Sequence, residues 1–315
     1  MSSASPDQPP PGAPTLCLGE PVVDLICERP LDDVSGADTF VPHFGGAVAA
    51  GAVTAARHGA HVVLAGGAGD DPWGRWLRGR LEREGVGTAL FELVPGAQTP
   101  LEIVAVAPGG EPSCRAYGER TATVAAALGD RIEEAVRGSA AVFISSDTLA
   151  SAEEAAVTMQ ARELALSLDR PVVFDPQLRI ERWRSRAEAA ATANACVPHA
   201  LLVRASAGDA ALMTGEDDPE RAALALLKAG ARMVVITLGP QEGAILRGEL
   251  RLDVDVDVDD APATVLSTIG AGAVLTGILL ARLATSAFYP ATVAASLPDA
   301  VAQAARACER WGALE

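Results

Sequence analysis

Short apolar runs typical of β-strands alternate with longer segments of helical pattern through most of the chain. In the second half of the sequence, strand-like runs at 141–145, 171–175, 200–203 and 233–238 alternate with helical patterns at 152–168, 186–195 and 220–229. Parallel strands need long crossover connections, and these are usually helices. The alternation therefore predicts an α/β fold with a doubly wound, mainly parallel sheet that carries helices on both faces.

One early region breaks this regular order. Strand-like runs at 101–107 and 113–117 flank the turn Pro108-Gly109-Gly110, with no helix between them. These runs predict a small β lid beside the main sheet, built from residues 22–27 and 99–117. The remaining elements are predicted as strands at 16–26 and 61–65, helices at 46–58, 71–84, 271–284 and 299–311, and a hairpin at 243–258.

The composition limits the class of protein. Of the 315 residues, 49% are hydrophobic and 21% are charged, which is typical of a folded domain and not of a disordered chain. The formal net charge of −16 disfavours nucleic acid and anionic membranes as partners, although it does not exclude a local basic pocket for a phosphorylated ligand. No apolar stretch reaches the roughly 18 uncharged residues of a membrane span.

The first residues and the cysteines indicate how the chain is organised and in which redox environment it folds. Residues 1–14 are rich in Ser and Pro and lack a signal-peptide pattern, so we expect a disordered leader followed by one domain at 15–315. The five cysteines lie far apart without a Cys-x-x-Cys pair. This spacing favours reduced thiols in the cytoplasm over a disulfide framework or a zinc site.

Three glycine-rich turns adjoin predicted helices or strands. Gly270-Ala271-Gly272 opens a long apolar helix, and the unpaired N–H groups of such a helix start can hold a phosphate. The segment 237–243 follows a strand, at the sheet edge where open α/β folds bind ligands. Gly45-Gly46 precedes another helix. Taken singly, each turn is also explained by a backbone that needs glycine.

Taken together and in order, these segments resemble the ribokinase/PfkB family of carbohydrate kinases. The motifs that carry the resemblance are Gly19-Glu20 with Asp24, Gly45-Gly46, Gly69-Asp70-Asp71 with Gly74, Asp175-Pro176-Gln177-Leu178-Arg179, Thr237 with Gly239 and Gly243, and Gly270-Ala271-Gly272. They span residues 16–314, and one extra residue precedes Gly243 relative to the family spacing. The resemblance implies a ribokinase-like fold with a lid and ATP-dependent phosphorylation of a sugar hydroxyl, with Mg²⁺ as cofactor. It leaves open a homodimer that pairs through the lid.

The resemblance also implies roles for individual residues. It assigns sugar binding to Asp24, Gly45, Gly46 and Arg179, nucleotide binding to Thr237, Gly239 and Gly243, and catalysis to the Gly270-Ala271-Gly272 turn.

The sequence departs from the family pattern at several polar positions. Ala273 stands where the family has its catalytic base, an aspartate. Ser206 and Asp209 replace an Asn-x-x-Glu element that organises Mg²⁺, so that Asp209 is the remaining candidate metal ligand. Ala50 replaces a sugar-binding asparagine, and Ser267 replaces a further aspartate. Loss of a positioned general base costs about 10² to 10⁴ in rate.

Two interpretations follow from this mixture. In the first, the protein is an ATP-dependent kinase of a sugar or sugar-like hydroxyl, slow because Ala273 replaces the base. In the second, it is a catalytically inactive relative, a pseudokinase, that binds nucleotide or sugar in a regulatory or partner-binding role. An engineered substitution at Ala273 is a third explanation, but it would leave Ala50, Ser206 and Ser267 unexplained.

Overall fold

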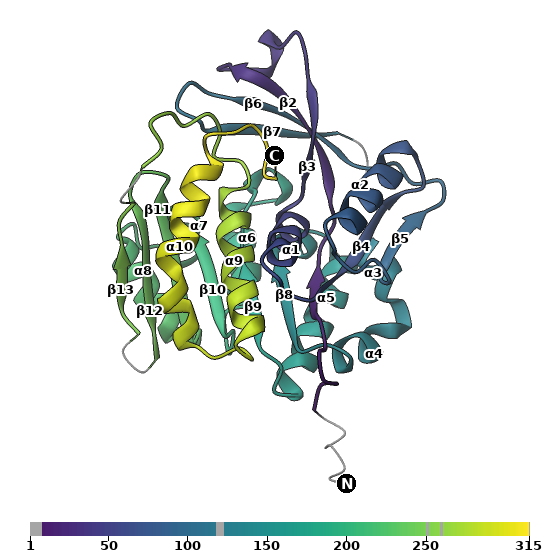
Figure 1. The fold of residues 1–315 in the computed structure, drawn as a ribbon, viewed down its shortest axis with the longest axis vertical. Coiled ribbons are helices and arrows are strands. Elements are labelled where there is room, and N and C mark those ends of the chain that lie inside the picture. The colour runs from purple at the N-terminus through teal and green to yellow at the C-terminus, as the bar shows by residue number, and fades with distance from the viewer. Residues whose placement is uncertain (1–7, 118–122, 250–251, 259–260, 315) are drawn as a thin grey trace.

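The structure is a computed structural model that describes residues 8–117, 123–249, 252–258 and 261–314. Its main sheet has the strand order β13-β12-β11-β10-β9-β8-β1-β4-β5, and β12 and β13 run antiparallel to their neighbours while the other pairs are parallel (Figure 1). The strands are β1 (Thr15–Leu18), β4 (Val62–Gly69), β5 (Phe91–Val94), β8 (Ala141–Ser145), β9 (Val172–Asp175), β10 (Leu202–Ser206), β11 (Met233–Gly239), β12 (Gly243–Gly248) and β13 (Val254–Val256). The predicted mainly parallel sheet is confirmed.

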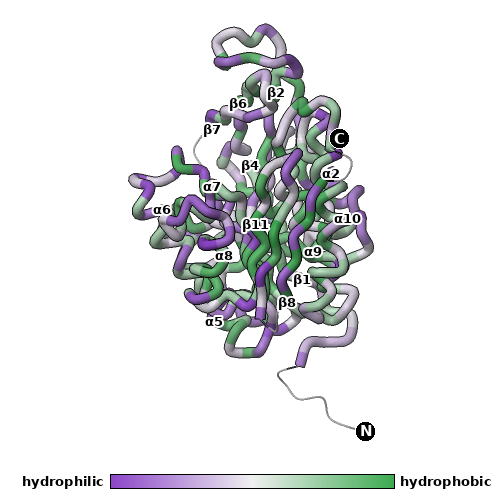
Figure 2. Tube along the Cα trace, turned by 90° about the vertical axis from the view of Figure 1, so that its left-hand side faces the viewer, coloured by the Kyte–Doolittle hydropathy of each residue, from purple (hydrophilic) through white to green (hydrophobic). Residues whose placement is uncertain are grey.

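Helices cover both faces of this sheet, as predicted. One face carries α1 (Ala47–Arg57), α2 (Pro72–Arg83), α9 (Ala271–Thr285) and α10 (Ala291–Ala307). The other carries α3 (Thr123–Leu128), α4 (Ile132–Arg137), α5 (Ala152–Ser167), α6 (Arg186–Asn194), α7 (Ala207–Thr214) and α8 (Pro219–Lys228). Hydrophobic residues gather along the central strands between these layers (Figure 2). Four short 3₁₀ helices are η1 (Val34–Gly36), η2 (Gly129–Arg131), η3 (Ser146–Leu149) and η4 (Ile180–Arg182).

A second, smaller sheet lies at one end of the molecule, at the top of Figure 1. It consists of β2 (Val22–Pro30), β3 (Val41–Gly45), β6 (Leu101–Val106) and β7 (Pro112–Tyr117), in the order β3-β2-β6-β7. The predicted lid segments are therefore present, and β3 joins them as a strand that the sequence analysis did not predict. We call this sheet the lid.

Two predicted elements differ from the structure. The run at 16–26 was predicted as one strand, but it divides around Pro21, so that β1 lies in the main sheet and β2 in the lid. The last helix was predicted at 299–311, directly after Pro298, a residue type that removes a helical hydrogen bond. Instead α10 begins at Ala291 and continues through Pro298, since Val293 and Leu297 fall on its buried face one helical turn apart.

The lid is joined to the main body through the first turn of α2. Asp71 caps this helix by accepting a hydrogen bond from the Gly74 N–H at 2.8 Å. The same carboxylate accepts bonds from the backbone N–H and the hydroxyl of Thr99, each at 2.8 Å, directly before β6 begins. A cap that normally serves one helix therefore also fixes the start of a lid strand.

Two further predictions concern the first residues and membrane-spanning segments. The predicted leader lies outside the described residues in its positions 1–7. Across the described part of the chain, every helix is too short or too polar to qualify as a membrane span.

Candidate active site

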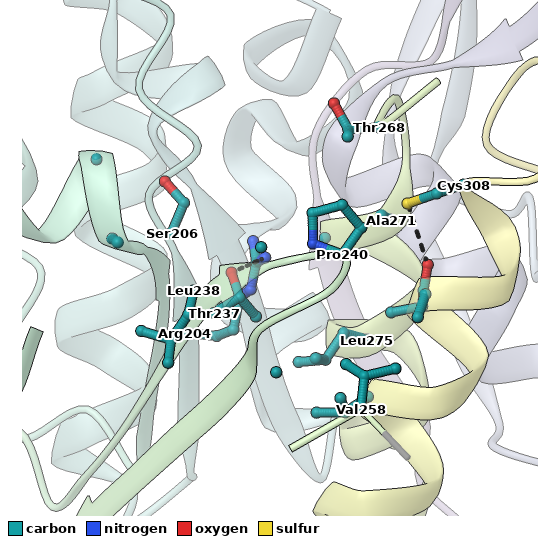
Figure 3. Close-up of a pocket in the computed structure, with 18 residues that line it drawn as sticks. Arg204, Ser206, Thr237, Leu238, Pro240, Val258, Thr268, Ala271, Leu275 and Cys308 are labelled. Carbon is teal, nitrogen blue, oxygen red and sulfur yellow. Dashed lines mark hydrogen bonds between the residues drawn. The ribbon is translucent and has the colours of Figure 1, made fainter. Parts of the chain in front are cut away.

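A cavity of about 340 Å³ opens where the carboxyl ends of β10 and β11 meet the start of α9 (Figure 3). Its polar side is formed by strand ends and the first turn of α9, and includes Arg204, Ser206, Thr237 and Gly272. Its apolar wall comes mainly from α9 and α10, and consists of Leu275, Val301, Ala304, Ala305 and Cys308. A ligand with an anionic end and an apolar end fits this division of the lining.

Most of the residues predicted for nucleotide binding and catalysis meet in this cavity. The lining includes the predicted Thr237, Gly239, Gly243, Ala271 and Gly272. Gly270 lies next to it and adopts a left-handed backbone with φ of 79°. A Cβ atom at Gly270 would stand 2.1 Å from the Cβ of Ala313, near the end of the chain. Gly270 is therefore required by backbone conformation and close packing, whatever else the turn binds.

Arg204 is the charged centre of the cavity. It lies on β10, and its side chain is only 7% exposed. Its Nη2 donates to the Thr237 hydroxyl at 2.8 Å, and its Nη1 lies 3.4 Å from the Asp175 carboxylate. A Cβ atom at Gly272 would stand 2.5 Å from Nη1, so the guanidinium group lies directly across the first turn of α9. Glycine at 272 makes room for this arginine.

Asp175, at the end of β9, anchors the other side of this arrangement. Its side chain is fully buried and accepts a 2.6 Å hydrogen bond from the Thr276 hydroxyl on α9. Burial raises the pKa of Asp175, while Arg204 and the Thr276 hydroxyl oppose that rise. Asp175 therefore links β9, β10 and α9, and it is not among the residues that line the cavity.

Asp209, the predicted metal ligand, is already engaged within the protein. Its Oδ1 accepts a bond from the Leu178 N–H at 3.2 Å, and its Oδ2 accepts one from the Ser206 hydroxyl at 2.8 Å. Burial raises the pKa of this carboxyl group, which further disfavours its charged form. Within the ranges that the structure describes, no three His, Cys, Asp or Glu side chains gather as metal ligands. The described residues therefore do not form a cation site from protein ligands alone, and both oxygens of Asp209 are engaged within the protein.

A second set of charged groups lies under the lid. Asp24 on β2 is 3% exposed and is paired in register with His43 on β3 and Glu102 on β6. A Cβ atom at Gly45 would stand 2.2 Å from the Asp24 Oδ2, so glycine at this position leaves room for the carboxylate. The two predicted sugar-binding residues are therefore in direct contact.

Glu102 forms an ion pair with Arg179, which follows the end of β9. Burial disfavours the charged guanidinium, but the Glu102 and Asp147 carboxylates outweigh it and raise the pKa of Arg179. Asp24 adds to the same effect. The ion pair between Glu102 and Arg179 thus connects the lid to the segment that follows β9 of the main sheet.

Two predicted site positions lie in the hydrophobic core instead. Ala273, at the position of the missing base, is 3% exposed, and Ala50 on α1 is 2% exposed. Both belong to the core cluster that packs α1 against α9, and neither lines the cavity. Gly46, a further predicted sugar-binding residue, is the N-cap of α1 and has a φ of 95°.

Arg204 and Glu102 were not predicted as site residues. Each lies inside a strand otherwise built of small or apolar side chains, in Leu202–Ser206 and Leu101–Val106. A charge inside a buried strand is rare unless it is paired. This signal was available in the sequence, but the partners, which come from distant segments, were not.

The chain belongs to the PfkB family of carbohydrate kinases, because the model of the pfkB family carbohydrate kinase matches residues 15–315. Among curated proteins, it is similar to probable fructokinase-4 of Arabidopsis thaliana, with 26% identity over 85% of this chain and 81% of that protein. Fructokinase-1 of Oryza sativa is 27% identical over 85% of this chain and 82% of the relative.

Solved structures agree with this assignment. Fructokinase from Vibrio cholerae, crystallised with fructose, ADP and calcium ion, superposes with a TM-score of 0.79 and 26% identity, over 96% of this chain and 94% of that one. Aminoimidazole riboside kinase from Salmonella enterica superposes with a TM-score of 0.80 at 22% identity, over 95% of each chain, which supports the fold alone. The ribokinase-like fold predicted from the motifs is confirmed.

Proposed function

We propose that this protein is an ATP-dependent kinase of a sugar or sugar-like hydroxyl, with a low turnover rate. The observation that carries the proposal is the pairing of two sites. A buried charged set under the lid, Asp24 with Glu102 and Arg179, suits a polyhydroxy compound. The neighbouring cavity, with Arg204 and the start of α9, suits a nucleotide. A ketohexose is our first candidate substrate, because three of the similar proteins reported above are named as fructokinases.

The rate is expected to be low because of position 273. Phosphoryl transfer depends mostly on positioning and charge stabilisation, and the acceptor hydroxyl must also lose a proton. At Ala273 no carboxylate receives that proton, so it passes to solvent. A positioned base is worth about 10² to 10⁴ in rate. Arg204 and the N–H groups at the start of α9 stabilise the transferring phosphoryl group.

A pseudokinase is the second candidate function. Asp209 supports it, because both of its carboxylate oxygens accept hydrogen bonds inside the protein. In this alternative the protein binds nucleotide or sugar without transferring phosphate, and its role is regulatory or partner-binding.

The test combines binding with product detection. Calorimetry with ATP, ADP, fructose and a panel of other sugars and polyols measures binding, and mass spectrometry detects phosphorylated sugar over long incubations. We expect binding of both ligands and product at a rate at least about 10² below that of an active fructokinase. Binding with no product would favour the pseudokinase. The absence of sugar and nucleotide binding would contradict both candidates.

Partners and location extend the same proposal. The partners we propose are the sugar and the nucleotide, together with a second copy of this chain that pairs through the lid, where Val41 and Tyr117 are exposed. Light scattering measures the expected homodimer. The five cysteines are unpaired, and reduced thiols fit our assignment to the cytoplasm.

A further inference from the structure

We propose that the cavity beside α9 holds the phosphates of its nucleotide through Arg204 and the first turn of the helix, without a divalent cation. The inference rests on the proposed function, because it takes the nucleotide to be the occupant of this cavity. It goes further by assigning to a side chain of this protein the charge that the family's enzymes take from a metal ion.

The first observation is the state of the Arg204 side chain. Although it is 7% exposed, its Nε has no hydrogen-bond partner among the described residues. Its two contacts with Asp175, at 3.4 and 3.5 Å, are longer than a normal charged hydrogen bond. Buried donors are nearly always satisfied. The described protein groups therefore do not use the full donor capacity of Arg204, and the long contacts leave Nη1 only weakly bonded.

The second observation is the position of the Arg204 side chain at the cavity wall. Arg204 lines the cavity together with Gly272 of the first turn of α9, and Figure 3 places its nitrogen atoms next to Thr237, on the side of the cavity towards Ala271. The start of α9 adds unpaired N–H groups and the positive end of the helix dipole. A planar guanidinium beside such N–H groups matches the geometry of phosphate oxygens.

The third observation is that the site leaves no suitable place for a metal ion. The carboxylates nearest to Arg204 are Asp175, which is fully buried, and Asp209, whose two oxygens bind Leu178 and Ser206. Mg²⁺ is usually held by one or two carboxylates together with substrate phosphates. A cation placed here would also face the positive charge of Arg204. The positive charge of the guanidinium thus replaces that of the metal ion in balancing the phosphates.

Calorimetry on the full chain tests this inference, with ADP and pyrophosphate titrated in Mg²⁺ buffer and in EDTA. We expect the Kd values for ADP in the two buffers to agree within about threefold, a difference below 1 kcal/mol. Binding of ADP that requires Mg²⁺ would overturn the inference and leave the proposed nucleotide site intact. If neither ADP nor pyrophosphate binds in either buffer, the proposed function fails together with the inference.

Variants at Arg204 supply the second arm. Arg204→Met should weaken ADP and pyrophosphate binding in EDTA by about tenfold or more, the scale of one charged hydrogen bond. Because this change leaves Asp175 buried without its cation, the double variant Arg204→Met with Asp175→Asn is measured beside it. Arg232→Met, an exposed arginine at the opposite end of the neighbouring strand, is the matched control. Unchanged binding in a folded Arg204 variant would overturn the inference.

Discussion

The two halves of the candidate site, one at the lid and one beside α9, differ in the charges that they contain. Under the lid, the carboxylates of Asp24 and Glu102 remain, and Arg179 comes from another segment to balance them. Beside α9, alanine occupies the base position at 273, and an arginine on β10 supplies a positive charge at the start of the helix. The lid half, which we propose binds the sugar, therefore balances two carboxylates with an arginine, while the half beside α9, which we propose binds the nucleotide, is centred on the arginine at 204.

The glycine motifs show why family signatures can outlast the chemistry that they usually accompany. Gly270 has a left-handed backbone and contacts Ala313, and Gly272 accommodates Arg204. Gly45 accommodates the Asp24 carboxylate. Each glycine is needed by a close contact within the folded protein, so its presence is no proof of turnover.

The largest effect is expected from removing the cation of the lid half. Arg179→Met removes the ion-pair partner of Glu102, whose side chain is only 3% exposed. We expect the free energy of unfolding to fall by about 3 kcal/mol, measured by urea denaturation. The double variant Arg179→Met with Glu102→Leu should recover most of the loss, because it removes both charges. A loss equal in the single and double variants would contradict the ion-pair explanation.

The buried carboxyl group of Glu154 provides a test by pH dependence. Burial, together with the Glu20 carboxylate, raises the pKa of Glu154 from 4.5 to about 7. The protonated form therefore stabilises the folded state below pH 4.5, and this contribution is lost as the pH rises through 7. Glu154→Gln should match the wild type at pH 4.5 and be more stable at pH 8, by up to about 3 kcal/mol.

Urea denaturation at the two pH values measures this difference. Gln at 154 keeps an oxygen that can accept the 3.0 Å hydrogen bond from the Val124 N–H. The matched control is Glu153→Gln, since Glu153 is the exposed neighbour on the same helix. If both variants show the same pH dependence, Glu154 does not carry the effect.

Much of the fold could be predicted from the sequence, because it depends on local patterns. The alternating apolar runs predicted the mainly parallel sheet. The glycine-rich turns predicted the sheet edge at which the cavity lies. The division of 16–26 between two sheets was not predictable from hydrophobicity, since both parts are apolar and only Pro21 marks the break. Likewise, Pro298 is a local helix breaker whose cost the packing of α10 outweighs.

The candidate site was predictable only where it follows a motif. The place of Arg204 in the site depends on Asp175, which lies 29 positions away in the sequence. That of Glu102 depends on Arg179, which lies 77 positions away. Likewise, the motif predicts Ala273 at the position of the family's base, but it does not predict that this side chain is buried in the core. Contacts between distant segments decide these points, and a single sequence does not contain them.

Removing one helix cap in each half of the site tests, with a smaller expected effect, how much each cap contributes to stability. Asp71 accepts three hydrogen bonds and joins α2 to the lid, whereas Ser206 caps only α7. We expect Asp71→Ala to lower the free energy of unfolding by about 2 kcal/mol and Ser206→Ala by about 1 kcal/mol, by urea denaturation. Asp70→Ala, at an exposed position next to Asp71, is the control. Equal losses at 71 and 206 would mean that the contact with Thr99 adds nothing.

The smallest effect is expected from restoring the family's carboxylate with Ala273→Asp. Residue 273 is 3% exposed and packs in the core between α1 and α9, outside the cavity lining. Burial at this position would raise the pKa of the new carboxyl group and hold it protonated, so that it could not accept the hydroxyl proton, and Asp209 stays bound to Ser206 and Leu178. We therefore expect the rate of sugar phosphorylation to change by less than about twofold, against the roughly 10²-fold or larger gain that a working base would give. Product formation measured by mass spectrometry decides between the two. Ala273→Asn, which matches the size of aspartate without its charge, is the control. A large gain with aspartate and none with asparagine would show that the nucleotide half had lost only its base, and the contrast between the two halves would then reduce to one residue.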